Sequence, residues 1–246
     1  MALFLNATLY NTTTGYETPN WGFGDLNIDQ TTKGFVHLAV SEYTAASAML
    51  TAFKGGLMKA EITPDMVPDN VPLKLTTTFM EGFLPGMVKT YGEDKPVTIK
   101  VKASDFPKPI FQSGKTGISL WVDLDFIVNG EVAICVHIND AKALVEASIK
   151  DFNAYGKIDS IAIDNIDATE SKIGFIDLGG LKAFFNIACR IAIPIVNMGL
   201  EKGFPIPKTF NNTIEIQSAT FTSNEHFLGV SVAPKFITSI FAWMFA

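Results

Sequence analysis

Much of the chain alternates between apolar and polar residues with the two-residue period of a half-buried β-strand. Such runs cover 71–79, 97–102, 118–126, 132–138, 145–149 and 158–163, and two more strands are expected near 214–221 and 227–232. Asn129-Gly130 separates two of the runs, which is a strong hairpin signal. Another turn is expected near 153–156. The pattern therefore predicts an antiparallel sheet with one face in solvent.

Two other segments repeat their apolar residues every three or four positions, as helices do. The first runs from Ser41 to Lys54 and ends at Gly55-Gly56, a signal for a helix C-terminus. The second runs from Asp177 to Glu201 and has a broad apolar face with only a narrow polar stripe. We expect most of this long helix to be covered, with the sheet curling around it. The predicted fold class is α+β.

The composition is more apolar than that of an average soluble domain. Of the 246 residues, 48% are hydrophobic and 18% are charged, whereas about 25% are charged in typical domains. A transmembrane helix does not explain the excess, because 178–200 contains Lys182, Asn186, Arg190 and Asn197. The apolar run at 236–246 is shorter than the roughly 20 residues that a bilayer core requires. No signal peptide is visible at Met1–Leu5.

Charge and motif content argue against several classes of function. The net charge of −6, without basic runs, makes nucleic acid an unexpected partner. The histidines His37, His137 and His226 are scattered, and the cysteines Cys135 and Cys189 form no metal or redox motif. The two cysteines could pair, although buried free thiols are favoured. We expect no catalytic residues, no metal and no cofactor other than a bound lipid, and the protein is not expected to be an enzyme.

Three glycosylation sequons begin at Asn6, Asn11 and Asn211. They suit a secreted or luminal glycoprotein. A chain rich in Asn and Thr also produces such triplets by chance. Both interpretations stay open.

Several segments, in order along the chain, resemble the C-terminal half of the bactericidal/permeability-increasing and lipopolysaccharide-binding family. They include Ser41-Glu42-Tyr43, Gly56-Leu57-Met58-Lys59, Asp65-Met66-Val67-Pro68, Phe83-Leu84-Pro85 and, most specifically, Lys202-Gly203-Phe204-Pro205-Ile206-Pro207. The resemblance implies a strongly twisted antiparallel sheet, or super-roll, wrapped around a long amphipathic helix, plus a second, N-terminal helix. It also implies a lipid in the apolar tunnel between sheet and helices.

The same resemblance implies a division of the chain into three parts. Residues 36–233 would form the lipid-binding barrel domain. Residues 1–35 resemble the end of a missing N-terminal barrel, with a strand at Leu3–Tyr10 followed by a linker. Residues 234–246 form an apolar extension beyond the family's typical end.

Candidate lipid-binding residues are the apolar side chains of the two helices and of the segment after 79. They are Tyr43, Leu50, Phe53, Leu84, Met87, Phe184, Phe185, Ile187, Ile191, Ile195 and Met198. For each of them ordinary core packing is the alternative, because apolar stripes at helical spacing usually form core. In the extension, the residues at helical spacing are Phe236, Ile237, Ile240, Phe241 and Met244. They predict a lid or membrane-surface helix, or a contact with a second barrel or protein partner.

The function implied is the binding of a phospholipid-like ligand and its transfer between membranes. The alternative is a structural or interaction subunit of a larger assembly, which uses the same fold and keeps its lipid permanently.

Overall fold

The computed structural model describes residues 7–10, 12–13, 15–22, 24, 26, 36–206, 208–210 and 214–236. The larger of two antiparallel sheets contains β2 (Lys59–Ile62), β3 (Val97–Ala103), β4 (Lys108–Gln112), β5 (Lys115–Val128), β6 (Glu131–Lys150), β7 (Asn153–Ala162), β8 (Asn165–Ser171) and β9 (Phe204–Pro205). The smaller sheet contains β1 (Val36–Ser41), β10 (Thr209–Phe210), β11 (Ile214–Asn224) and β12 (Phe227–Phe236). The helices are α1 (Glu42–Lys54), α2 (Thr77–Met80), α3 (Met87–Tyr91) and α4 (Leu178–Leu200), with a 3-10 turn η1 (Pro64–Met66).

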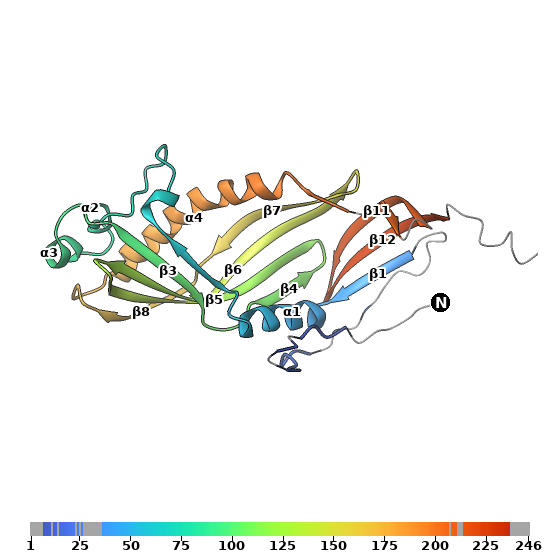
Figure 1. Ribbon diagram of the computed structural model, residues 1–246, viewed down its shortest axis with the longest axis horizontal. Coiled ribbons are helices and arrows are strands. Elements are labelled where there is room, and N and C mark those ends of the chain that lie inside the picture. Colours follow the sequence, from blue (N-terminus) through green and yellow to red (C-terminus); the bar gives the residue numbers. More distant parts are fainter. Residues whose placement is uncertain are drawn as a thin grey trace, which may run out of the picture.

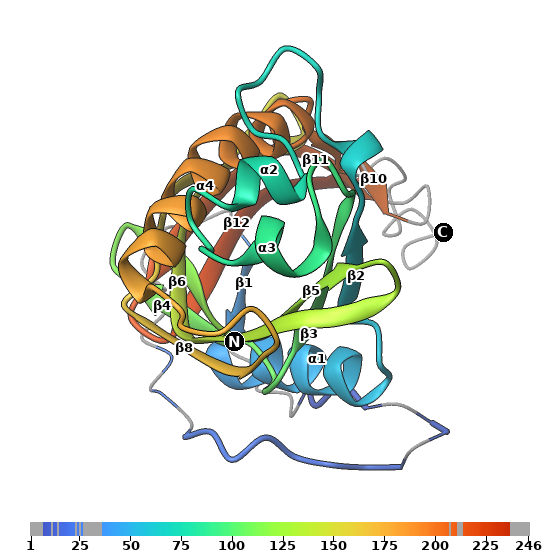
Figure 2. The same ribbon diagram turned by 90° about the vertical axis from the view of Figure 1, so that its left-hand side faces the viewer.

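The larger sheet curls along the long axis of the molecule. Its strand order is β2-β3-β5-β6-β7-β9, with β4 also paired to β5 and β8 also paired to β6. In Figure 1, α4 lies along one side of the curl, α1 along the other, and the smaller sheet lies at one end. The view along the long axis shows α2 and α3 across the opposite end (Figure 2). The predicted curled antiparallel sheet with a long helix and a second, N-terminal helix is confirmed.

Local sequence signals explain where the main elements begin and end. The β5–β6 hairpin turns at Asn129 and Gly130, whose φ angles of 53° and 81° match a turn that needs two positive φ values. The Ser41 side chain accepts a hydrogen bond from the Thr44 backbone N–H and caps α1. Asp177 caps α4 in the same way, because its carboxylate accepts from the N–H of Gly179 at 2.9 Å.

Three sequence-based predictions about strands and turns are wrong. The alternating run 71–79 is not a strand, because the Thr76 hydroxyl accepts the Phe79 N–H at 3.3 Å and starts α2. The turn expected near 153–156 lies earlier, at Asp151 and Phe152, which both have positive φ angles. In the expected strand Leu3–Tyr10, the described residues 7–10 are not a strand. The Leu9 backbone bonds to side chains of α1 instead.

The hydrophobic core fills the end of the curl that α2 and α3 close. Its fully buried side chains include Phe126, Phe184, Met80, Leu84, Met87 and Leu181. The Phe184 ring lies 5.4 Å from that of Phe185 and 6.0 Å from that of Phe126, between ring centroids. Because the protein's own side chains occupy this end, space for a ligand has to lie further along the axis.

Only the N-terminal half of α4 is well covered. Leu181, Phe184 and Phe185 are buried, whereas Ile195 is 47% exposed and Met198 is 66% exposed. The prediction that most of this helix is covered is therefore wrong, because α2 and α3 close only the end where α4 begins. With 23 residues, α4 also meets the length and composition of a helix that could cross a membrane, despite its polar stripe.

Candidate functional site

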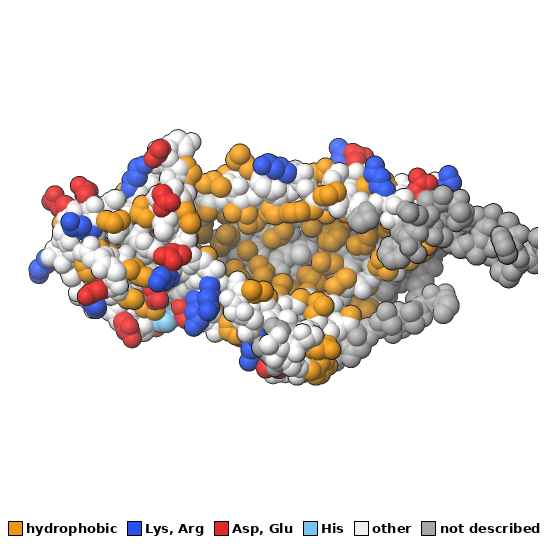
Figure 3. All heavy atoms as spheres, viewed as in Figure 1, with side chains coloured by type: hydrophobic (Ala, Val, Ile, Leu, Met, Phe, Trp, Pro, Cys, Tyr) orange, Lys and Arg blue, Asp and Glu red, His pale blue; other side chains and the backbone are white. Residues whose placement is uncertain are grey.

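A hollow lined by hydrophobic side chains opens in the middle of the molecule (Figure 3). In the same view as Figure 1, α4 borders the hollow on one long side and α1 on the other, and strands of the larger sheet lie behind it. Most charged side chains on this face lie outside the hollow. The hollow is the strongest candidate for a functional site on the face shown, because large exposed apolar surfaces usually mark ligand-binding grooves or interaction sites.

The wall formed by α4 carries the apolar face of the helix out of the core. Ile187 and Ile191 are partly buried against the core cluster, and Ile195 and Met198 follow at helical spacing. At 3.6 residues per turn, Ile195 lies on the same side of the helix as Leu181 and Phe184, which point into the core. Ile195 therefore projects in the same direction as these core residues. At its position along α4 the core has ended, so its side chain faces the hollow.

A polar side chain on the opposite side of α4 holds the helix against the sheet. The Asn197 amide donates to the carbonyl oxygen of Ile158 on β7 at 2.9 Å. The Asn197 side-chain oxygen, Oδ1, accepts from the Ile158 backbone N–H at 2.7 Å. Asn197 is only 7% exposed, and this contact leaves the apolar face of α4 free.

The opposite wall, α1, is packed against β4 and the N-terminal segment. Tyr43 and Leu50 are 6% and 8% exposed, and Phe53 is partly buried. The Tyr43 hydroxyl lies 3.2 Å from the Thr8 hydroxyl, and the Leu9 backbone N–H donates to Ser47 Oγ at 3.0 Å. Tyr43 and Leu50 therefore stabilise the wall through packing.

Apolar side chains of the larger sheet form rows across its strands. The pairing places Pro109, Ile118, Ala143 and Ile161 opposite one another on β4, β5, β6 and β7. The neighbouring row on the same face contains Thr116 and Val145, which line a cavity at the end of the hollow. Since directly opposed residues of an antiparallel sheet share a face, both rows face the same space.

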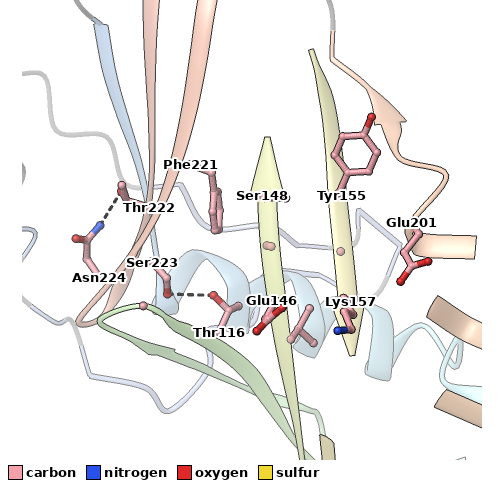
Figure 4. A pocket seen from close by; sticks show the side chains of 14 residues that line it. Thr116, Glu146, Ser148, Tyr155, Lys157, Glu201, Phe221, Thr222, Ser223 and Asn224 are labelled. Carbon is pink, nitrogen blue, oxygen red and sulfur yellow. Dashed lines mark hydrogen bonds between the residues drawn. The ribbon is translucent and has the colours of Figure 1, made fainter. Parts of the chain in front are cut away.

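This cavity, the seam cavity, lies where the two sheets meet and has a volume of about 730 Å³. Figure 4 shows Phe221 on β11 extending toward Ser148 on β6, with Tyr155 on β7 and Glu201 after α4 on the other side. The apolar part of the lining also includes Val145 and Ala147, and the charged part is Glu146, Lys157 and Glu201. The volume is in the range of ligand pockets, about 300–1,000 Å³.

Hydrogen bonds around Ser223 fix the seam between the sheets. Ser223 Oγ lies 2.9 Å from the Gln112 carbonyl oxygen and 2.7 Å from that of Lys115, and it accepts from the Thr116 hydroxyl at 3.0 Å. The Gly114 backbone N–H donates to the Ser223 carbonyl at 3.0 Å. The β4–β5 hairpin therefore holds β11 in place at the edge of the cavity.

Polar side chains on the other face of the larger sheet form a separate cluster. His137 Nδ1 lies 2.7 Å from Asp123 Oδ1, and its Nε2 lies 2.8 Å from the Thr169 hydroxyl. Burial raises the pKa of the Cys135 thiol to about 12, and the neighbouring Asp125 adds to the shift. Within the described ranges no group of three or more His, Cys, Asp or Glu side chains is arranged to hold a metal ion.

Both cysteines are free. Cys135 on β6 and Cys189 on α4 are each partly exposed, so the expectation that they are fully buried is wrong. Burial also raises the pKa of the Cys189 thiol. Because a thiolate is the reactive form, neither thiol is activated for chemistry.

The structure thus divides the predicted lipid-binding residues into three groups. Leu84, Met87, Phe184 and Phe185 lie in the packed core, while Ile187, Ile191, Ile195 and Met198 follow α4 along the hollow. The third group is Tyr43, Leu50 and Phe53 on α1. The seam-cavity residues were missed by the sequence reasoning, because they come from strands far apart in the chain. The sequons at Asn6, Asn11 and Asn211 and the apolar residues Ile237, Ile240, Phe241 and Met244 lie outside the described residues, as does the side chain of Phe236.

Comparisons with known proteins agree with this architecture. The crystal structure of a lipopolysaccharide-binding protein superposes with a TM-score of 0.58 and 19% identity, covering 93% of this chain and 50% of that one. The lipopolysaccharide-binding protein of Homo sapiens is 23% identical over 184 residues, which are 70% of this chain and 36% of the relative. The bactericidal permeability-increasing protein of Sebastes schlegelii is 20% identical over 206 residues, 78% of this chain and 41% of the relative.

The chain therefore spans about two fifths of the length of these two relatives. Residues 9–235 match the family described as the LBP / BPI / CETP family, C-terminal domain. Since this match covers most of the chain, the protein belongs to the LBP / BPI / CETP family, which it matches through the C-terminal domain.

Proposed function

We propose that this chain binds a phospholipid-like ligand, with acyl chains in the hollow between α4 and the larger sheet. The observation that carries the proposal is the apolar face of α4, which leaves the core and stays exposed at Ile195 and Met198. The LBP / BPI / CETP family is one of lipid-binding proteins, and this supports the same ligand class.

The energetics favour a carrier. Each buried methylene is stabilised by about 0.8 kcal/mol relative to water, so an ordinary acyl chain gains on the order of 10 kcal/mol. A bilayer interior offers nearly the same gain, so moving a lipid from membrane to hollow has a small net free energy. We therefore propose that the protein transfers lipid between membranes. Its structure would control how a lipid enters and leaves the hollow.

The seam cavity suits the polar end of such a ligand. It combines aromatic and aliphatic residues, including Phe221 and Val145, with hydroxyl and charged side chains. Ligand sites with this composition hold the apolar part by burial and orient it through a few polar groups.

A pair of variants on α4 tests the proposal. Ile195→Asp places a carboxylate on the apolar face, and Asn186→Asp places one at an exposed position of the polar stripe. We expect Ile195→Asp to lower the amount of bound fluorescent phospholipid at least tenfold, because a charge in an apolar site is strongly disfavoured. Asn186→Asp should bind like the wild type.

Exchange of labelled phospholipid between vesicles distinguishes a carrier from a permanent lipid complex. The wild-type protein should accelerate exchange, and Ile195→Asp should not. Bound lipid that never exchanges would favour the structural subunit instead. Equal binding by Ile195→Asp and the wild type would contradict the placement of the acyl chains in the hollow.

We also infer that the protein is secreted or luminal and glycosylated. The support is the three sequons at Asn6, Asn11 and Asn211. Digestion of the protein from its native source with an N-glycosidase should increase its gel mobility. An unchanged mobility would contradict glycosylation.

A further inference from the structure

The smaller sheet has two chemically different faces. Its strand pairing places Leu38, Val230 and Phe221 in one row across β1, β12 and β11. The rows on either side of it, on the same face, contain Val36 with Val232 and Val40 with Leu228. The opposite face contains His37, Ser231 and Thr220, which form the intervening row. One face is therefore apolar and the other is polar.

The apolar face is open and continuous with the seam cavity. On β1, Val36, Leu38 and Val40 are 47%, 56% and 44% exposed. Phe221 lines the seam cavity and points toward β6 (Figure 4). Because Phe221 shares a row with Leu38, the apolar surface runs from the cavity onto the outer strand of the smaller sheet.

On another side of the hollow, α4 presents further exposed apolar residues. Ile195 and Met198 are 47% and 66% exposed. We call the apolar face of the smaller sheet together with these two residues of α4 the apolar rim. A rim of this kind favours contact with an apolar partner, since each of its side chains gains from leaving water.

From this surface we propose that the apolar rim docks the protein on an uncharged lipid bilayer, so that the hollow opens directly onto the membrane. This inference rests on the lipid binding proposed above. A lipid that left the membrane through water would lose the stabilisation of its acyl chains, whereas a docked rim gives it a continuous apolar path. The net charge of −6 disfavours an anionic bilayer, which leaves a zwitterionic surface as the partner.

Two glutamate substitutions on opposite faces of one sheet test the inference with the full 246-residue chain. Leu38→Glu places a charge on the apolar face, and Thr220→Glu places one at an exposed position of the polar face. In flotation with phosphatidylcholine vesicles, Leu38→Glu should bind at least tenfold more weakly than the wild type. Thr220→Glu should bind equally well. Val36→Glu, on the same apolar face and at a residue that is 47% exposed, is a second variant, and it should also bind more weakly.

Circular dichroism and the lipid extracted from each variant show that fold and bound lipid are retained. Unchanged vesicle binding by both Leu38→Glu and Val36→Glu would overturn the inference. Binding restricted to anionic vesicles and released by salt would also overturn it. A third contrary result is concentration-dependent self-association that Leu38→Glu abolishes without affecting vesicle binding, because a second copy would then cover the face. Absence of lipid from the wild-type protein would instead refute the proposed function itself.

Discussion

The side chain of Asn197 on α4 completes the backbone hydrogen bonding of Ile158 on β7. Both the N–H and the carbonyl oxygen of Ile158 bond to the Asn197 amide, at 2.7 and 2.9 Å. The contact joins the long helix to the larger sheet from the side opposite the hollow. The position of α4 against the sheet therefore depends on a polar anchor as well as on apolar packing.

Removing this anchor should destabilise the fold. Asn197→Ala eliminates two hydrogen bonds and leaves the Ile158 backbone groups without these partners, which should lower the free energy of unfolding by about 2–4 kcal/mol. Asn186→Ala, at an exposed site of the same helix, should change it by less than about 0.5 kcal/mol. Urea unfolding followed by circular dichroism measures both. Equal midpoints for the two variants would show that the anchor contributes nothing.

The two ends of α4 should respond oppositely to Gly→Ala substitution. A Cβ at Gly180 would lie 2.6 Å from the Phe83 carbonyl oxygen, whereas a Cβ at Gly199 would have no neighbour within 4 Å. Gly199→Ala should therefore stabilise the protein by up to about 1 kcal/mol through helix propensity. Gly180→Ala should destabilise the protein, because the helix has to move away from the Phe83 carbonyl oxygen. Thermal unfolding of both variants provides the comparison, and a stabilising Gly180→Ala would contradict this close packing.

Shortening a side chain to alanine should have different effects on stability at the packed end and at the open part of α4. Phe184→Ala should cost about 3–5 kcal/mol of unfolding free energy, because it leaves a cavity in the core. Met198→Ala, at a side chain that is 66% exposed, should leave stability nearly unchanged while weakening lipid binding. Chemical unfolding and phospholipid binding of both variants test this division. A stability loss at Met198 as large as at Phe184 would place that side chain in the core.

The Cys135 thiol should be slow to alkylate. Its pKa is raised from 9.0 to about 12, and three pKa units correspond to roughly a thousandfold smaller thiolate fraction near neutral pH. Because the folded state holds this proton more tightly than the unfolded state, the thiol favours folding below pH 9 and this contribution declines as the pH rises above 9. Iodoacetamide labelling with peptide mass spectrometry should show much faster modification in urea. Rapid labelling of Cys135 in the folded protein would be the contrary result.

The sequence predicted the two long helices and the longest strands because their signals are local. Asn129-Gly130 defined the β5–β6 hairpin, and the apolar period of α4 defined a helix that begins beside Asp177. The run 71–79 was misassigned because its alternation also fits a loop that buries Leu73 and Leu75 before a capped helix. β8 was missed because its sequence shows no strong alternation, and β1, β2, β4, β9 and β10 were also missed because each has at most six residues.

The candidate site was predicted only in part, because it depends on contacts between distant segments. Helical periodicity identifies Phe184 and Ile195 as one apolar face, but the closure of the curl by α2 and α3 decides that one is core and the other borders a hollow. The seam cavity is lined by Tyr155 and Phe221, which are far apart in the chain, and hydrogen bonds hold β11 against the β4–β5 hairpin at its edge. The division of the chain into three parts remains a prediction.

Native mass spectrometry of the chain, purified without detergent and followed by organic extraction, tests the central proposal most directly. We expect the protein to carry a lipid with acyl chains, at about one molecule per chain, and Ile195→Asp to carry much less than Asn186→Asp. A folded wild-type protein whose mass equals that of the polypeptide and its covalent modifications alone, with no extractable lipid, would contradict the account.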